Sequence, residues 1–145
     1  MNRKKRMDIA LLAIRLAFGF RLIYGVSDNI MHWDRMLEFR DFLLENGFPF
    51  PLICGLISVY TQLFAGISWI IGYKVRVFSL LMLLNFTIAI IQVHLWHGDS
   101  YIQTAPAIHM LVVAFLIYFA HAGKYSADAY LEKKKKKHQR HVQTF

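Results

Sequence analysis

The sequence predicts an all-α integral membrane protein: a four-helix bundle with antiparallel neighbours and an amphipathic extramembrane helix between the first two spans. Four apolar segments carry this prediction, at about residues 9–28, 52–73, 75–96 and 105–122. Each is close to the ~20 residues that a helix needs to cross ~30 Å of hydrocarbon. Hydrophobic residues make up 57% of the chain and charged residues 18%, against about 45–50% and about 25% in soluble domains. We expect residues 1–131 to form one transmembrane domain, followed by a basic tail at 132–145.

Basic and acidic residues outside these segments lie mostly on opposite sides of the predicted membrane. Thirteen Lys and Arg residues lie before the first span, between the second and third, or after the fourth, whereas six of the nine acidic residues lie at 28–45 or at Asp99. Basic loops are retained in the cytoplasm, so both termini are predicted to be cytoplasmic. The net charge of +8 is therefore read as a topology signal. The expected partner is the lipid bilayer and not nucleic acid.

The first span is expected to remain in the protein as a helix. Its apolar core contains Arg15 and Arg21, and no small-residue cleavage pattern follows it, as would follow a secretory signal. The turns at 73–76 and 97–104 are short. The third span must therefore run antiparallel to both the second and the fourth.

The long connection between the first two spans also has a helical pattern. Its apolar residues recur at spacings of three and four, with acidic residues on the opposite side, and Asn46-Gly47, Pro49 and Pro51 mark its end. The apolar set is Trp33, Met36, Leu37, Phe39, Phe42, Leu43 and Leu44. We predict an amphipathic helix that lies on the outer surface or caps the bundle.

Polar side chains within the spans are the candidate ligand-binding residues. They are Arg15, Arg21, Tyr24, Asp28, Gln62, Asn85, Gln92, His94 and His109. An arginine at mid-membrane costs about 2.5–3.5 kcal/mol, so such residues usually face the bundle interior or a wet cavity. Arg21 and Asp28 lie two turns apart on one face of a helix, as do Asn85 and Gln92. The prediction is a polar pocket that opens to the outer side; the alternative is that these groups only join helices by hydrogen bonds.

Histidines and the single cysteine limit the chemistry. His94, His97 and His109 are expected near the outer surface, where imidazole binds metals or exchanges protons. No carboxylate accompanies them within the third or fourth span, so neither haem nor metal is expected. Cys54 is the only cysteine, which excludes an internal disulfide and Cys-x-x-Cys exchange. No complete catalytic motif is present, and the catalytic residues stay unknown.

Several short motifs resemble those of the DoxX family, over about residues 8–131. In chain order they are Leu11-Leu12-Ala13-Ile14-Arg15-Leu16-Ala17-Phe18-Gly19-Phe20 with Tyr24-Gly25, Gly47-Phe48-Pro49-Phe50-Pro51-Leu52, Ala65-Gly66 with Ile71-Gly72 and Arg76, and Gly123-Lys124-Tyr125-Ser126-Ala127-Asp128. Two positions depart from the family pattern: Gln62 stands where the family often has Glu, and Asp28 where it often has Lys. Among the polar residues within the spans, only Arg15 matches the residue that recurs at the same position in the family.

The resemblance implies a four-helix protein of a bacterial-type inner (plasma) membrane. Named members are small subunits of thiosulfate:quinone oxidoreductase or partners in membrane redox complexes. The cofactor is unknown, with quinone as the candidate, and the candidate partner is a soluble or membrane redox subunit. The alternative is a non-catalytic scaffold or homo-oligomer without a bound small molecule, whose small residues pack another subunit. These small residues are Gly55, Ala65, Gly66 and Ser68.

Overall fold

The computed structural model describes residues 2–142, which form six α-helices and one π-helical segment. The helices are α1 (Arg3–Met31), α2 (Trp33–Glu45), α3 (Pro51–Ile71), α4 (Val75–Ala89), which the π-helical segment η1 (Ile90–Leu95) continues, α5 (Tyr101–Ala120) and α6 (Ala127–Val142). Four of them are long and apolar enough to cross a membrane, namely α1, α3, α4 with η1, and α5. This confirms the predicted all-α fold with four spans and a short helix between the first two.

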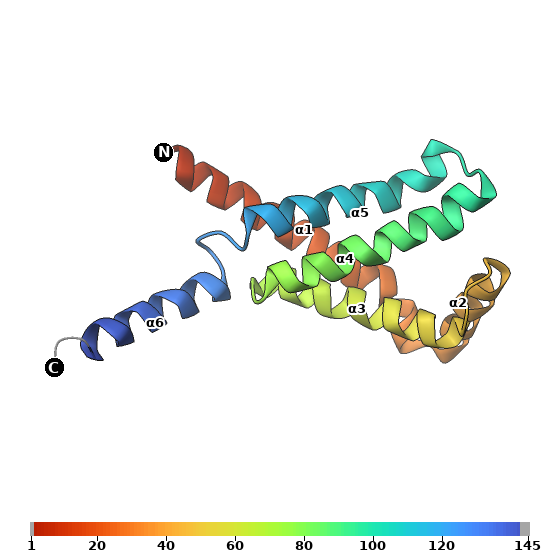
Figure 1. The fold of residues 1–145 in the computed structure, drawn as a ribbon, viewed down its shortest axis with the longest axis horizontal. Coiled ribbons are helices and arrows are strands. Elements are labelled where there is room, and N and C mark those ends of the chain that lie inside the picture. The colour runs from red at the N-terminus through yellow and green to blue at the C-terminus, as the bar shows by residue number, and fades with distance from the viewer. Residues whose placement is uncertain (1, 143–145) are drawn as a thin grey trace.

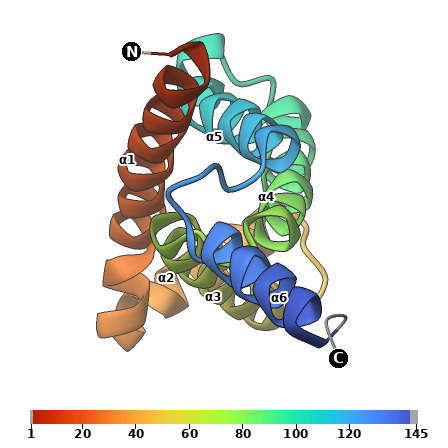
Figure 2. The same ribbon diagram turned by 90° about the vertical axis from the view of Figure 1, so that its left-hand side faces the viewer.

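The four spans run side by side along the long axis of the molecule, with α1 crossing obliquely (Figure 1). Both described termini lie at one end of the bundle, here called the terminal end, and α6 projects away from it (Figures 1 and 2). The helix α2 folds across the opposite end, here called the α2 end. In the bundle α1 packs against α3, and α4 packs against α5.

Local sequence signals set several helix ends. Pro51 occupies the first turn of α3, where its missing N–H costs nothing, and Gly72 ends this helix at φ +78°. The helix α5 begins with a capping box in which the Ser100 and Gln103 side chains bond at the first turn. These signals set both ends of the second span and the start of the fourth.

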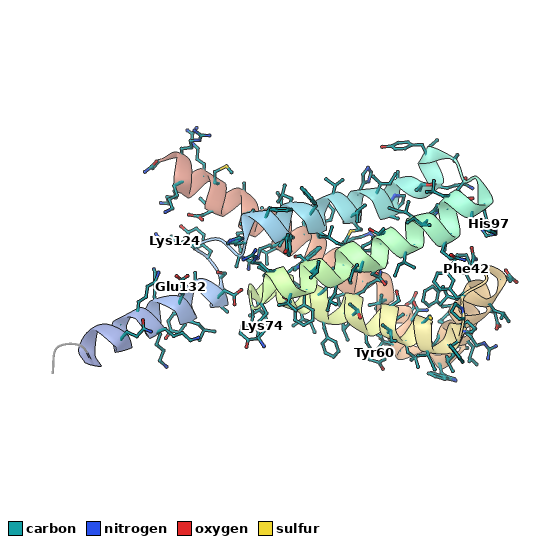
Figure 3. The ribbon with its side chains drawn as sticks, in the orientation of Figure 1. Phe42, Tyr60, Lys74, His97, Lys124 and Glu132 are labelled. Carbon is teal, nitrogen blue, oxygen red and sulfur yellow. The ribbon has the colours of Figure 1, made fainter. Side chains whose placement is uncertain are left out.

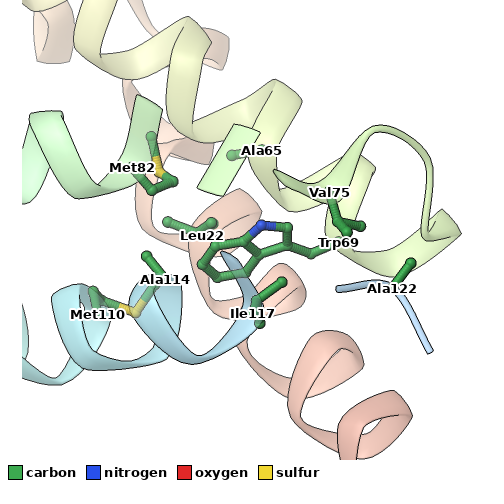
Figure 4. Packing of buried hydrophobic residues seen from close by; sticks show 9 residues of the cluster. All are labelled: Leu22, Ala65, Trp69, Val75, Met82, Met110, Ala114, Ile117 and Ala122. Carbon is green, nitrogen blue, oxygen red and sulfur yellow. The ribbon is translucent and has the colours of Figure 1, made fainter. Parts of the chain in front are cut away.

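The main core surrounds the indole of Trp69, which is fully buried on α3. Leu22 of α1, Met82 of α4 and Ile117 of α5 pack around it, so all four spans contribute (Figure 4). The Trp69 Nε1–H donates to Ser79 Oγ at 3.0 Å. The only polar atom of the indole is thereby satisfied inside the core.

The predicted amphipathic character of α2 is confirmed. Met36 and Leu43 are buried, and Met36 belongs to a second apolar cluster with Val26 of α1 and Val59 of α3. The acidic residues of α2 are all exposed: Asp34, Glu38, Asp41 and Glu45. Because its apolar side packs on α1 and α3, α2 closes one end of the bundle and encloses space beneath it.

The backbones of α1 and α3 approach closely at Gly19 and Gly66. A Cβ on Gly66 would lie 2.7 Å from the Gly19 carbonyl oxygen, and a Cβ on Gly19 would lie 2.8 Å from that of Gly66. The small residues of α3 that the sequence offered to another subunit, Gly55, Ala65, Gly66 and Ser68, are all buried within the chain. They pack this protein's own helices, in the way small residues do at membrane helix interfaces.

Candidate functional site

A pocket of about 310 Å³ lies at the α2 end, between α2, α3, α4 and η1. Phe42 of α2 lies at this end, as does His97 after η1 (Figure 3). Most of the lining is apolar and aromatic: Phe39, Phe42, Leu43, Phe48, Cys54, Ile57, Ile88, Ala89 and Val93. Three polar side chains join this lining, from Ser58, Asn85 and His94. An apolar concavity with a few polar groups is the usual form of a small-molecule site.

The amide of Asn85 is held in place by α3. Ser58 Oγ donates a hydrogen bond to Asn85 Oδ1 at 2.9 Å, and Gln62 Nε2 donates to Ser58 Oγ at 3.2 Å. The Asn85 Nδ2 group has no hydrogen-bond partner among residues 2–142. The pocket therefore has a free N–H donor whose orientation is set by two neighbouring side chains.

A carboxylate positions the histidine of the pocket. His94 Nδ1 lies 2.8 Å from Asp99 Oδ2, and both side chains are about a quarter exposed or less, at 20% and 26%. With Nδ1 engaged by the carboxylate, Nε2 is the ring nitrogen left for a ligand, and the neutral ring would accept a hydrogen there. Helical periodicity does not identify Asp99 as a site residue, because it belongs to a loop and its approach to His94 depends on how the chain turns at Gly98.

The π-helical segment η1 separates two residues that were predicted to share a face. In a continuous α-helix Asn85 and Gln92, seven apart, would point the same way. The wider turn of η1 changes the direction of the side chains that follow. Gln92 Nε2 donates instead to the backbone oxygen of Asn46 at 3.0 Å, whereas His94 lines the pocket. Gln92 thus fastens η1 to the chain after α2.

Three of the predicted site residues lie on the exposed side of α1. Arg21, Tyr24 and Asp28 are exposed, because the side of α1 that faces the bundle is marked by Leu22 and Val26. None of the three lines the pocket. The structure therefore separates them from Asn85 and His94.

The guanidinium of Arg21 follows the surface of its own helix. A Cβ on Gly25, one turn further along, would lie 2.9 Å from Arg21 Nη1. The missing side chain at Gly25 gives the guanidinium room to extend toward the α2 end. This is the snorkelling arrangement that brings a long basic side chain to the membrane boundary.

Arg15 lies at the terminal end and is 1% exposed. Its Nε donates to the carbonyl oxygen of Trp69 at 2.8 Å, and Nη2 donates to that of Ile70 at 3.3 Å. Its Nη1 donates to the carbonyl oxygens of Ala122 and, at 3.1 Å, Tyr125. Arg15 therefore joins α1 to the end of α3 and to the loop after α5, and the structure places it away from the pocket.

Two carboxylates complete this closure of the terminal end. Asp8 Oδ1 accepts from the backbone N–H of Lys124 at 3.1 Å, and Asp128 Oδ1 accepts from that of Lys74 at 3.0 Å. The backbone N–H of Asp128 in turn donates to the Gly72 oxygen at 3.0 Å. The motif at 123–128 is thus fixed to α1 and to the turn between α3 and α4.

The remaining histidines do not gather at the pocket. His109 is exposed on α5, and His97 Nδ1 lies 2.8 Å from the Val93 carbonyl oxygen. Within residues 2–142, no three His, Cys, Asp or Glu side chains form a group that could hold a metal ion.

Comparison with known proteins identifies the family. No curated protein and no solved structure matches this chain. The sequence model described as DoxX matches residues 10–95, which include every residue that lines the pocket beneath α2. The match covers more than half of the 145 residues, and the chain therefore belongs to the DoxX family.

Proposed function

We propose that this DoxX protein is a small subunit or partner of a membrane redox complex, and that it binds the ring of a quinone in the pocket beneath α2. The observation that carries the proposal is the composition of this pocket. Aromatic and aliphatic walls surround a fixed amide donor and a carboxylate-bound histidine. A quinone ring is flat and apolar, with carbonyl oxygens that accept hydrogen bonds.

The polar groups suit the two oxidation states of such a ring. Asn85 Nδ2 would donate to one carbonyl oxygen of the quinone. His94 Nε2 would accept a hydrogen bond from a hydroxyl group of the reduced form, with Asp99 fixing the orientation of the imidazole ring. In this proposal the oxidised ring takes up two electrons from a redox centre of the partner subunit and two protons from water at the α2 end, which gives the hydroquinone.

The pocket is also open to a ligand that arrives through the membrane. Ile57 of α3 and Ile88 of α4 line it and are 63% and 52% exposed, respectively. Both belong to helices long and apolar enough to span the bilayer. Their exposure indicates an opening toward the lipid between α3 and α4. A quinone could enter there ring first and leave its apolar tail among the lipid chains.

Replacement of the amide tests the site. Asn85→Leu should weaken the binding of decylubiquinone at least tenfold, because one hydrogen bond is worth about 1 kcal/mol or more and the leucine also occupies part of the pocket. The measurement is the decylubiquinone concentration that half-saturates the rise in melting temperature of the purified protein in detergent. Thr87→Leu, on the exposed side of the same helix, is the matched control and should bind like the unchanged protein.

Ala89→Phe provides an independent steric test. Ala89 lines the pocket, so a benzyl group there should exclude the ring without changing any polar group. If the unchanged protein neither binds decylubiquinone nor retains a quinone through purification, the quinone proposal fails. Equal binding by the unchanged protein and both pocket variants would place the quinone elsewhere.

We also propose a bacterial-type inner membrane location with both termini in the cytoplasm, supported by the basic residues at the terminal end and the acidic residues on α2. A reporter fused after Phe145 should be cytoplasmic, and one inserted near Glu45 should lie on the outer side, because an odd number of spans separates the two positions. Accessibility of the two reporters in intact cells and inverted vesicles measures this. Detection of both on one side would contradict the orientation.

A second candidate function is a non-catalytic scaffold or homo-oligomer, and the exposed side of α1 favours it. Arg21, Tyr24 and Asp28 are exposed there, and a charged side chain is more stable against protein than against lipid. Co-purification of another membrane protein, lost in Arg21→Leu, together with failure of decylubiquinone binding, would support the scaffold function.

A further inference from the structure

The terminal end carries a second concavity, unrelated to the pocket beneath α2. A groove of about 790 Å³ lies between the first turns of α1, the start of α4, the loop after α5 and the first turns of α6. Figure 2 looks onto this end and shows the loop between α5 and α6 crossing it, and Figure 3 labels Lys124 and Glu132 there. Five cationic side chains line the groove: Lys4, Lys5, Arg76, Lys124 and Lys133.

The carboxylates of the groove are occupied by other partners. Asp8 and Asp128 accept hydrogen bonds from backbone N–H groups. Glu132 pairs with Lys136 at 2.6 Å, and this hydrogen bond lowers the pKa of the Glu132 carboxyl group. None of the five lining cations forms an ion pair within residues 2–142. With five lining cations and three lining carboxylates, the groove carries an excess of positive charge.

Part of this charge is held in place by the fold. The Arg76 guanidinium lies 5.3 Å from the centroid of the Tyr118 ring, in a cation–π contact. The backbone of Lys124 is fixed by Asp8. Both residues lie where the chain enters or leaves an apolar span. Lipid phosphates are expected at this end of the spans, and Met7 and Phe119, which precede the groove residues Asp8 and Ala120 in the sequence, are exposed apolar residues.

We propose that this groove binds the headgroup of an anionic phospholipid, with the phosphate among Lys5, Arg76 and Lys124. A basic residue near an anionic membrane surface contributes about 1 kcal/mol, which corresponds to roughly a fivefold change in affinity. The position at the end of the spans favours a lipid over a free anion, because the acyl chains of a lipid bound there would remain in the bilayer.

Two triple variants with the same loss of charge test the groove. Lys5→Gln with Arg76→Gln and Lys124→Gln removes three lining cations. Arg3→Gln with Arg6→Gln and Lys137→Gln removes three cations of the same end that do not line it. The full chain in neutral detergent is titrated with phosphatidylglycerol or phosphatidylcholine. The readouts are the melting temperature and the lipids retained in native mass spectrometry.

We expect phosphatidylglycerol, and not phosphatidylcholine, to raise the melting temperature and to be retained. The phosphatidylglycerol concentration that half-saturates the rise in melting temperature should increase by roughly a hundredfold in the groove variant, because three cations are removed at roughly fivefold each. In the control variant this concentration should change little. Equal loss of phosphatidylglycerol binding in the two triple variants would overturn the proposal, since it would indicate diffuse attraction of the lipid to the whole basic end. Equal stabilisation by inorganic phosphate or glycerophosphoglycerol would identify a free-anion site instead. No preference for phosphatidylglycerol would also refute the proposal.

Discussion

Arg15→Leu is expected to lower the melting temperature of the chain in detergent by on the order of 10 °C. The substitution removes the donors for four backbone carbonyl oxygens, on Trp69, Ile70, Ala122 and Tyr125. A buried acceptor left without a partner costs about 1–3 kcal/mol. Even if water reaches some of these oxygens, the loss should be about 3–5 kcal/mol. For a chain of this size 1 kcal/mol corresponds to roughly 2–4 °C.

Arg21→Leu is the matched control on the same helix. Arg21 is exposed and forms no ion pair within residues 2–142, so its loss should change the melting temperature by no more than about 2 °C. Arg15→Lys should resemble Arg15→Leu, because a single ammonium group cannot reach carbonyl oxygens in four directions. Circular dichroism during heating measures all three variants. An Arg15→Leu protein as stable as Arg21→Leu would show that this network contributes little.

The two arginines also show what the sequence could predict. Hydropathy and charge placed both within the first span, and this level of description was sufficient for the fold and for α2. The direction of Arg21 around the helix was predicted toward a pocket, whereas the structure exposes Arg21 and buries Arg15. Arg15, Gly19, Leu22 and Val26 are spaced by four, three and four residues and form the buried stripe of α1. That spacing was the available signal that Arg15, and not Arg21, faces the bundle.

The pocket was predicted only in part, for a physical reason. The sequence analysis placed Asn85 and His94 in the same half of the bundle, and both line the pocket at the α2 end. Their separation from Gln92 depends on η1, because a π-helical segment changes the side-chain direction that a seven-residue spacing implies. The hydrogen bonds from Ser58 to Asn85 and between His94 and Asp99 join different helices or a helix and a loop. Periodicity along one segment carries no information about such contacts.

The two ends of the bundle differ in how their polar residues are used. At the terminal end Arg15, Asp8 and Asp128 bond to backbone groups of other segments, which fixes the chain path. At the α2 end Asn85 retains a free donor beside an apolar cavity. This contrast is why the proposed ligand site includes Asn85 and His94 and leaves out Arg15.

Gly66→Ala is expected to destabilise the bundle by about 1–3 kcal/mol, the usual cost of overpacking. The new methyl group would lie 2.7 Å from the carbonyl oxygen of Gly19 and 2.7 Å from Ile23 Cγ1. The backbone oxygen cannot rotate away as a side chain can. Since α1 and α3 must separate to admit the methyl group, the packing around the nearby Trp69 should loosen as well. The melting temperature in detergent should fall by roughly 2–10 °C.

Gly55→Ala makes the same change on the same helix and isolates the effect of the close approach. A Cβ on Gly55 would meet only the side chains of Phe39 and Leu43, both at 3.4 Å, which is close to ordinary van der Waals contact. Alanine also favours a helix over glycine by up to about 1 kcal/mol. Gly55→Ala should therefore leave the melting temperature unchanged or raise it, while Gly66→Ala lowers it. If the two variants had the same melting temperature, the contact between Gly19 and Gly66 would not limit how closely α1 and α3 pack.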